Sequence, residues 1–544
     1  MNFKENQTEQ KLRGGYYTPL DLAAFLVRWI NDIKPTRVLE PSCGDGAFFI
    51  EAAKRLQNVS VTGFELDSVE AKKAFRTGKD CGLENLSVRD EDFLGWAVSR
   101  LSDKSEKFDA VLGNPPFIRY QYLPSVFQDR AERIFGELDC KFTKHTNAWV
   151  PFILASIEML RPSGRLAMVV PAEILHVAHA QSLRTYLGLQ CRRVVIVDPE
   201  ELWFEGTLQG AVLLMAEKKS EPSEAGDGLV IHPVRGRNFL NSDPASIFEG
   251  GTSINGKTVA GKWTRAILNK STRDIIDDLE NHSKIRKFKE IAKVDVGIVT
   301  GANKFFLVDD RTVDEFDLSK WAHPMFGRSE HCPGIIYDKA QHAANAVKGS
   351  PTNFVWLKGN DVEQNPKVRK YIRRGEGESL HTRYKCRIRK PWYTVPSVYS
   401  TEVGMLKRAH NAPRLILNRI QALTTDTAYR IRVLEGAADQ LVYSFINPLT
   451  ALSAELEGRH YGGGVLELVP SEIERLLMPI LSIAEPEIEQ LDHAIRNSSM
   501  DDVLEAQSRK ILGGLGLSKS KQTDVLGGWH KLRNRRQRVS TDVA

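Results

Sequence analysis

The first 220 residues alternate between segments of helical periodicity and short apolar runs of strand length. The expected helices are 18–30, 47–56 and 149–160, and Thr18 with Asp21 is expected to cap the first of them in a capping box. The expected strands are 37–41, 59–67, 108–113, 165–171, 193–198 and 210–218. Strands separated by helices predict an α/β fold, with a Rossmann-like, mostly parallel, doubly wound sheet.

This regular alternation ends after the last expected strand. Residues 217–228 carry almost no apolar side chains, so we expect them to form a linker. Short strands and many turn residues then follow to about Pro479, which predicts a mixed α+β domain. A helical segment comes last and ends in the basic run 530–538. The predicted domains are therefore residues 1–220, 221–480 and 481–544.

Composition narrows the class of protein. The chain has 544 residues, of which 42% are hydrophobic and 26% charged, as in a soluble globular protein. Its net charge of +6 permits a nucleic-acid partner without requiring one. The six cysteines form no CxxC pair, which indicates a reducing cytoplasm and no zinc or other structural metal. A polar N-terminus and the lack of a long apolar run argue against a signal peptide and a membrane span.

A glycine turn joins the first expected strand to the following helix, in the sequence LEPSCGDGAFF (39–49). Gly44 and Gly46 allow a close approach of the backbone to a ligand, at the strand end where open α/β sheets bind nucleotides. Glu40 and Asp45 bring negative charge, which would repel a phosphate and attract an ammonium group. S-adenosylmethionine therefore fits better than NAD or ATP, although an ordinary strand–helix turn remains the alternative.

Two further acids follow later strands. Glu65 stands about 20 positions after the glycine turn, where a carboxylate can accept from both hydroxyls of a ribose. Asp92 and Phe93 could accept from an adenine amino group and pack on its ring. The alternatives are a helix cap or loop acid for each carboxylate, and a core aromatic for Phe93.

The loop Asn114-Pro115-Pro116-Phe117 is the sharpest chemical signal, because it directly follows an apolar strand. Two prolines hold the backbone extended. The Asn114 side-chain oxygen and the Pro115 carbonyl could accept both hydrogens of an exocyclic amino group, and Phe117 could stack on the base. Such positioning would make the nitrogen lone pair available for methyl transfer without a strong base.

Taken in order, GGYYTP (14–19), LEPSCGDGAFF, GFELD, DFL and GNPPF resemble the gamma-class, TaqI-like adenine-N6 DNA methyltransferases of restriction–modification systems. The resemblance covers roughly residues 14–218. It implies a class I methyltransferase domain followed by a target-recognition domain. It also implies a cofactor set and a target-base site. The cofactor residues would be Tyr17, Thr18, Glu40, Ser42, Gly44, Glu65, Asp92, Phe93 and Asn114; the catalytic loop would be Asn114, Pro115, Pro116 and Phe117.

The resemblance assigns a role to each group. Tyr17, Thr18 and Glu40 would hold the methionine part of the cofactor. A second aromatic would flank the flipped base opposite Phe117; Phe204 matches it best, with Trp203 as the alternative. The chain departs from the commonest pattern because NPPF ends in phenylalanine where tyrosine is usual, which preserves stacking but removes a hydroxyl.

The second region carries a basic stretch between Lys367 and Lys390, in which Tyr371, Tyr384, Trp392 and Tyr393 are interleaved or adjacent. Such a stretch suits a DNA backbone, although a solvated charged face is the alternative. The expected DNA-binding residues are Arg373, Arg374, Arg383, Lys385, Arg387, Arg389 and Lys390. Segments 297–308 and 459–470 also resemble target-recognition sequences of the family.

The sequence thus predicts an enzyme that flips adenine out of double-stranded DNA and methylates its N6, in a restriction–modification or phage-defence setting. We expect a cytoplasmic bacterial or archaeal monomer, with a separate endonuclease as partner. The alternatives are an RNA or protein-glutamine methyltransferase, a cytosine-N4 enzyme, or a catalytically silent DNA-binding relative. Asp198, Glu217 and Lys219 spell a nuclease-like D…ExK pattern that we attribute to chance.

Overall fold

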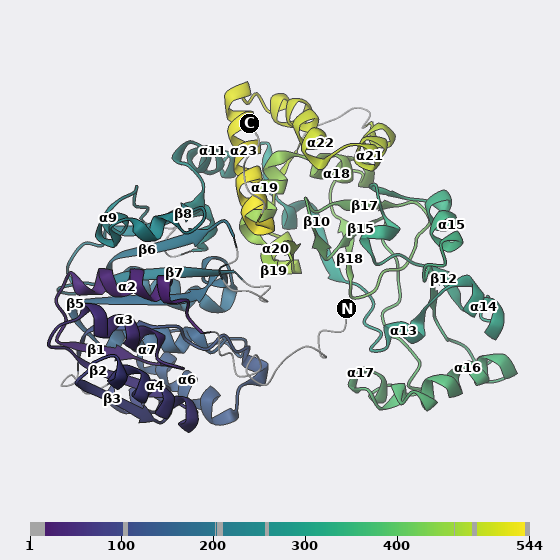
Figure 1. The fold of residues 1–544 in the computed structure, drawn as a ribbon. Coiled ribbons are helices and arrows are strands. Elements are labelled where there is room, and N and C mark those ends of the chain that lie inside the picture. The colour runs from purple at the N-terminus through teal and green to yellow at the C-terminus, as the bar shows by residue number, and fades with distance from the viewer. Residues whose placement is uncertain are drawn as a thin grey trace. The chain divides into compact units, whose positions relative to one another are not determined.

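The computed structural model describes residues 17–101, 107–201, 203, 210–255, 261–461, 463–480 and 487–538. The chain forms two compact units. The first comprises Met1–Ile267 together with Arg538–Ala544, and the second comprises Leu268–Gln537 (Figure 1).

An eight-stranded sheet forms the centre of the first unit, in the order β3-β2-β1-β4-β5-β7-β6-β8. The strands are β1 (Arg37–Glu40), β2 (Ser60–Glu65), β3 (Asn85–Asp90), β4 (Phe108–Gly113), β5 (Leu160–Pro171), β6 (Cys191–Pro199), β7 (Ala211–Lys218) and β8 (Gly228–Val234). Only β7 runs antiparallel to its neighbours β5 and β6, and the other pairs are parallel. The predicted mostly parallel α/β sheet is confirmed.

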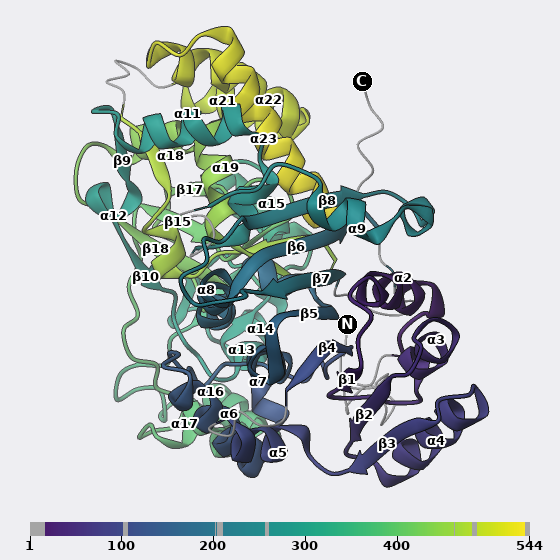
Figure 2. The same ribbon diagram turned by 90° about the vertical axis from the view of Figure 1, so that its left-hand side faces the viewer.

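Helices cover both faces of this sheet (Figure 2). On one face lie α2 (Leu20–Asn31), α3 (Ala47–Arg55) and α4 (Ser68–Asp80); on the other lie α5 (Phe93–Arg100), α6 (Ser125–Glu137), α7 (Trp149–Met159) and α8 (Gln181–Gln190). Helix α7 is buried on nearly every side, with Glu158 the only residue that is not. This explains why its sequence is apolar all round rather than along one stripe.

The predicted cap of the first helix is wrong. Helix α2 begins at Leu20 after Pro19, and no side chain caps it. Asp21 accepts from the backbone N–H of its neighbour Leu22 instead. Pro19 leaves Thr18 one position too early to cap the helix, and the Thr18 hydroxyl contacts the catalytic loop described below.

The polar run 217–228 does not separate the two units. Strand β7 ends at Lys218, and β8 returns to the same sheet and pairs in parallel with β6 from Gly228 to Val234. Leu229 and Val230 of this strand are buried. The first unit therefore extends through α9 (Pro244–Glu249) to Ile267, beyond the predicted boundary at residue 220.

The second unit mixes helices with small sheets. A five-stranded sheet has the order β10-β18-β15-β17-β13, in which only β13 and β17 pair in parallel. Its strands are β10 (Ala292–Val296), β13 (Ile336–Tyr337), β15 (Val403–Leu406), β17 (Leu415–Asn418) and β18 (Ala428–Val433). Smaller sheets are formed by β9 (Ile285–Lys287) with β21 (Leu477–Pro479), by β11 (Leu307–Val308), β12 (Ala322–Pro324) and β14 (Asn353–Val355), and by β16 (Arg408–Ala409), β19 (Arg459–Tyr461) and β20 (Val465–Glu467).

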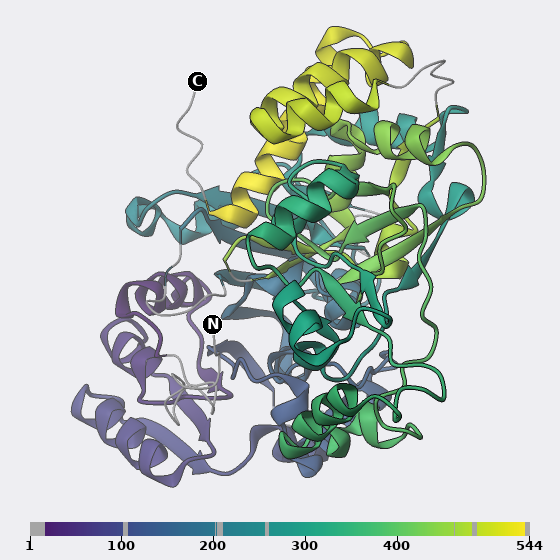
Figure 3. The same ribbon diagram turned by 90° about the vertical axis from the view of Figure 1, so that its right-hand side faces the viewer.

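Helices are distributed throughout the second unit. Its α-helices are α11 (Lys270–Glu280), α12 (Phe288–Ile291), α13 (Asn303–Phe306), α14 (Asp310–Phe316), α15 (Lys339–Val347), α16 (Pro366–Gly377), α17 (Tyr384–Arg387), α18 (Ala438–Phe445), α19 (Pro448–Glu457), α20 (Pro470–Ile473), α21 (Ile488–Asn497), α22 (Met500–Gln507) and α23 (Lys519–Gln537). The yellow helices α21 to α23 gather at one end of this unit, and the green helices α16 and α17 lie at the other (Figures 1 and 3).

The predicted separate C-terminal segment is instead part of the second unit. Helix α23 packs on α19, and the basic run 530–538 forms the last turns of this helix, up to Gln537. Arg536 and Glu455 form an ion pair in which neither side chain is exposed, with 2.7 Å between Nη2 and Oε1. The buried pair gives part of this basic run a structural role.

All six cysteines are free thiols. Among the described helices, none is both long and apolar enough to cross a membrane.

Candidate active site

Four strands of the first unit bring the candidate residues to one edge of the sheet. Glu40 ends β1, Glu65 ends β2, Asp92 follows β3 and Asn114 follows β4. Strands β3, β2, β1 and β4 are consecutive and parallel in the sheet, so their carboxyl ends meet at the same edge. The ends of neighbouring parallel strands are where open α/β sheets bind ligands.

The glycine turn after β1 folds against the end of β2. The Gly44 N–H donates to Glu65 Oε2 at 3.0 Å, and the Cys43 N–H donates to the Phe64 carbonyl at 2.9 Å. Gly44 and Gly46 have φ of +52° and +89°, which other residues adopt only with strain. A Cβ on Gly46 would also lie 3.3 Å from the backbone of Ala74, so this turn requires glycine there.

Glu40 is a buried carboxylate that lacks a full set of partners. It is 2% exposed, and its Oε2 has no hydrogen-bond partner among the described residues. Burial raises the pKa of Glu40 well above its ordinary value, and the negative charges of Asp45 and Glu65 raise it further. Burial also raises the pKa of Asp45. A buried acid beside two others favours a cationic ligand group, so this site fits the ammonium end of S-adenosylmethionine.

The Glu65 carboxylate is held in one orientation by the backbone. Its Oε1 accepts from the Asp67 N–H at 3.0 Å, while Oε2 accepts from Gly44. Each carboxylate oxygen has a second lone pair. Glu65 can therefore accept from ribose hydroxyls while its backbone bonds remain in place.

Asp92 caps a helix and also pairs with an arginine. Its Oδ2 accepts from the Gly95 N–H at 2.8 Å, as the N-cap of α5, and lies 2.6 Å from Arg130 Nη1. Phe93 is 2% exposed, and its ring centroid lies 5.5 Å from that of Phe64. Phe93 therefore packs in the core, as the alternative interpretation of its sequence position held. Its contact with the cofactor adenine stays a prediction. The sequence did not point to Arg130, which lies 38 positions from its partner.

The catalytic loop is fixed by two side chains from other segments. The Asn114 Nδ2 donates to the Thr18 hydroxyl at 3.2 Å, and the Asn114 carbonyl accepts from the Ser42 hydroxyl at 3.0 Å. Thr18 is 8% exposed and Pro115 is buried. Because the amide nitrogen faces Thr18, the Asn114 side-chain oxygen is directed to the opposite side of the amide group.

A second pair of residues holds the chain that leaves this loop, and sequence analysis missed both. Asn147 Oδ1 accepts from the Tyr120 N–H at 3.3 Å, and Asn147 Nδ2 donates to Glu173 Oε2 at 3.3 Å. Burial raises the pKa of Glu173, partly offset by the positive charge of Arg119. The available signal was the position of Glu173, two residues after the end of β5, which neighbours β4.

The residues proposed to flank the target base are only partly described. Phe117 and Pro116 are half-buried at the loop. Phe204 lies outside the described residues. Trp203 is 5% exposed and stacks on Phe239, with ring centroids 5.7 Å apart, so it is a core residue rather than a base-flanking one.

Two families of known proteins match separate stretches of the chain. The profile of the family described as N-6 DNA Methylase matches residues 3–239, and that of the M.Eco57I type II methyltransferase C-terminal domain matches residues 260–512. The chain thus contains a region, residues 3–239, that is similar to the N-6 DNA methylases. Its reaction is therefore adenine-N6 methylation of DNA, and S-adenosylmethionine is the methyl donor.

Two type II methyltransferases are similar to this methyltransferase over most of their length. M.AccI of Acinetobacter calcoaceticus is 23% identical over 490 residues, which cover 85% of this chain and 84% of M.AccI. M.XamI of Xanthomonas campestris pv. amaranthicola is 22% identical over 483 residues, covering 86% and 85%. The solved DrdV–DNA complex is similar in fold, with a TM-score of 0.50 and 12% identity; the match covers 90% of this chain and 57% of the DrdV chain.

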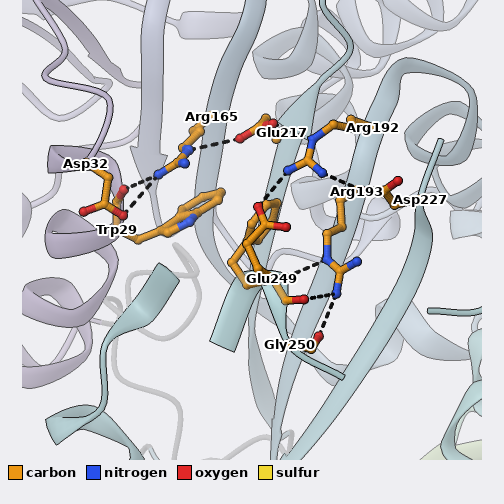
Figure 4. A network of polar contacts seen from close by, with 10 residues as sticks. Trp29, Asp32, Arg165, Arg192, Arg193, Glu217, Asp227, Glu249 and Gly250 are labelled. Atoms are coloured by element: carbon orange, nitrogen blue, oxygen red, sulfur yellow. Dashed lines mark hydrogen bonds and ion pairs between the residues drawn. The ribbon is translucent and has the colours of Figure 1, made fainter. Parts of the chain in front are cut away.

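The nuclease-like D…ExK pattern of the methyltransferase is part of a structural network. Glu217 accepts from Arg165 Nε at 3.2 Å and from Arg192 Nε at 2.6 Å, and Arg192 also pairs with Asp227 (Figure 4). Asp198 is 3% exposed. No group of His, Cys, Asp or Glu among the described residues is arranged to hold a metal ion.

In the second unit, the basic stretch of the methyltransferase is largely on the surface. Arg373, Arg374, Arg383, Lys385, Arg387 and Lys390 are exposed. Arg389 is half-buried and donates to the carbonyls of Val299 and Thr300, both at 2.7 Å. Arg389 therefore holds two backbone segments of this unit together, which makes it a weaker candidate for a phosphate contact than the exposed residues.

Proposed function

We propose that this chain is a sequence-specific modification methyltransferase whose catalytic group is Asn114, held for attack on a flipped adenine. The observation that carries the proposal is the fixed orientation of Asn114 between Thr18 and Ser42, at the sheet edge that also holds the buried Glu40. A type II restriction–modification or phage-defence setting is proposed from the relatives M.AccI and M.XamI.

The acids at the sheet edge would hold the cofactor. S-adenosylmethionine, when bound, supplies an electrophilic methyl group on a positively charged sulfur. Glu40 would accept from its ammonium group, Glu65 from the ribose hydroxyls and Asp92 from the adenine amino group. Tyr17 and Thr18 would line the methionine end, beside the turn that contains Ser42 and Gly44.

The catalytic loop would bind the target amino group. Asn114 Oδ1 and the Pro115 carbonyl would each accept one hydrogen of the adenine N6 amino group, which draws the nitrogen toward tetrahedral geometry. Positioning of this kind accounts for much of the acceleration in reactions that need no strong base. Phe117 would stack on the base, with Phe204 on its other side, and Pro116 would keep the loop extended.

The adenine must leave the duplex to reach this loop. Flipping costs a few kcal/mol, which stacking and the two amino-group hydrogen bonds would offset. The exposed cations of the second unit (Arg373, Arg374, Arg383, Lys385, Arg387 and Lys390) would bind the phosphates of double-stranded DNA. A monomer acting in the cytoplasm beside a separate endonuclease is the organisation we propose.

The test is modification-sensitive sequencing of DNA from a methylation-free host that expresses the protein. We expect N6-methyladenine within one recurring short sequence, and none when Asn114→Ala is expressed at the same level. Binding of S-adenosylmethionine by Asn114→Ala should remain within a few-fold of wild type, which shows that the variant is folded. Full activity of Asn114→Ala would refute the proposed mechanism. Unmodified DNA from a soluble wild-type protein that binds the cofactor would refute DNA as the substrate.

A further inference from the structure

The short helix α17 and the residues after it present two exposed apolar side chains on a basic surface. Tyr384 and Ile388 are each 62% exposed. The backbone from Tyr384 to Ile388 is helical, so side chains four positions apart lie on one face. The exposed cations Arg383, Lys385, Arg387 and Lys390 surround this pair in the sequence.

Other aromatic residues of the same stretch are turned inward. Tyr371 is 2% exposed and stacks on Phe305 at 4.5 Å between ring centroids, and Tyr393 is 6% exposed. The Trp392 ring also packs on Phe305, at 4.9 Å. The exposure of Tyr384 is therefore not explained by packing in this unit, and an exposed aromatic beside an exposed isoleucine indicates a surface that meets a partner.

The turn that carries this pair is firmly anchored. Cys386 is fully buried, and Arg389 donates to the carbonyls of Val299 and Thr300 at 2.7 Å. Gly301 has φ of +81°, and a Cβ there would lie 2.7 Å from Lys385 Cβ, so the two backbones are in close contact. A rigid turn loses little conformational entropy when it binds a partner.

The charges around the pair identify the partner. Among the described residues, no carboxylate forms an ion pair with Arg383, Lys385, Arg387 or Lys390. Four unneutralised cations beside two apolar side chains are complementary to nucleic acid, which offers phosphates next to apolar base surfaces.

We propose that Tyr384 and Ile388 enter a groove of duplex DNA and insert between base pairs, while the flanking cations bind the phosphates. This inference rests on the proposed function, because it takes DNA as the substrate. Apolar side chains that enter a groove partly unstack base steps and kink the duplex. The bent duplex can then offer further contacts, at positions where no base edge is read.

The experiment compares uncharged with charged substitutions on the same surface. The double variant Tyr384→Ser/Ile388→Ser should bind a short mixed-sequence duplex roughly tenfold more weakly than wild type, with the same dependence on salt, because neither side chain releases counterions. Arg383→Gln should instead reduce the slope of log affinity against log salt by about one. Val347→Ser is the matched control, since Val347 is 89% exposed in α15 of the same unit, and it should bind as wild type.

Insertion itself is measured by plasmid relaxation with a topoisomerase. Saturating wild-type protein and Arg383→Gln should each leave the plasmid with an altered linking number, whereas the double variant should leave it unchanged at equal occupancy. The inference would be overturned if the double variant bound duplex DNA as tightly as wild type, or if wild type caused no change in linking number. In either case, DNA methylation by wild type would still support the proposed function. Failure of wild type both to bind duplex DNA and to methylate it would overturn both.

Discussion

Replacing Glu40 with glutamine should weaken cofactor binding and stabilise the free protein at the same time. Glutamine has the same shape but no charge, so the substitution isolates the charge of a side chain that is 2% exposed. A hydrogen bond to a charged group contributes about 1.5–3 kcal/mol. At about 1.4 kcal/mol for each factor of ten, the dissociation constant for S-adenosylmethionine should rise by roughly 10- to 150-fold.

The stability of the free protein should move in the opposite direction. Burial and the charges of Asp45 and Glu65 raise the pKa of Glu40, so the folded protein holds this proton more tightly than the unfolded chain does. The contribution of Glu40 to stability is fully present below its unfolded pKa, and it is lost as pH rises through the raised folded pKa. Glu40→Gln has no such loss, so its melting temperature should exceed that of wild type above this pH window.

Calorimetric titration of the cofactor at several pH values tests both parts of this reasoning. An ammonium group prefers the ionised carboxylate, so wild type should release a proton on binding below the raised pKa, and its affinity should rise with pH. Glu40→Gln should show neither effect. Glu51→Gln is the control, because Glu51 is 3% exposed but already paired with Lys54 and Arg55; it should lose stability and keep cofactor affinity. Equal cofactor affinity of Glu40→Gln and wild type across pH would refute the role of Glu40.

Three further substitutions test other contacts. Thr18→Val removes the hydroxyl that accepts from the Asn114 amide. The rate of single-turnover methylation should therefore fall by tenfold or more, while DNA affinity stays unchanged. An unaltered rate would contradict the role of Thr18 in positioning Asn114. Asn147→Ala releases the chain that leaves the catalytic loop, and we expect kcat to fall more than cofactor affinity; equal losses in both would indicate a general loss of structure instead. Arg536→Met leaves Glu455 buried without its arginine partner, so the free energy of unfolding measured by chemical denaturation should fall by about 3–5 kcal/mol. Adding Glu455→Met should restore most of that loss, and no recovery would show that the ion pair is not its cause.

The candidate site was predictable because its residues follow strands that local sequence patterns define. Glu40, Glu65 and Asn114 each stand at or directly after an apolar run, and parallel strands bring such positions to one sheet edge. The pattern specifies the strands and their ends but not the contacts between them. The bonds of Thr18 and Ser42 to Asn114 join positions 96 and 72 residues apart, which no local periodicity reveals.

The predictions of a domain boundary at residue 220 and of a separate C-terminal segment were wrong for related reasons. A polar loop between two strands of one sheet has the same composition as a linker between domains, and only the pairing of β8 with β6 distinguishes them. A basic run is usually solvated, but Arg536 meets Glu455, 81 residues away, in a fully buried position. In both cases a long-range partner decides the outcome, and composition carries no information about that partner.

The two contacts of Asn114 also connect the cofactor segments with the catalytic loop. Ser42 belongs to the glycine turn, and Thr18 precedes the first helix, yet both hold Asn114 directly. A ligand that orders either segment therefore restricts Asn114 as well. Part of the conformational entropy of the catalytic amide would then already be lost when the cofactor binds, before the target base arrives. Coupling between binding free energies is reciprocal, so a target adenine held by Asn114 would strengthen cofactor binding by the same factor. The hydrogen bonds that orient the amide thus provide a direct route by which occupancy of one subsite prepares the other.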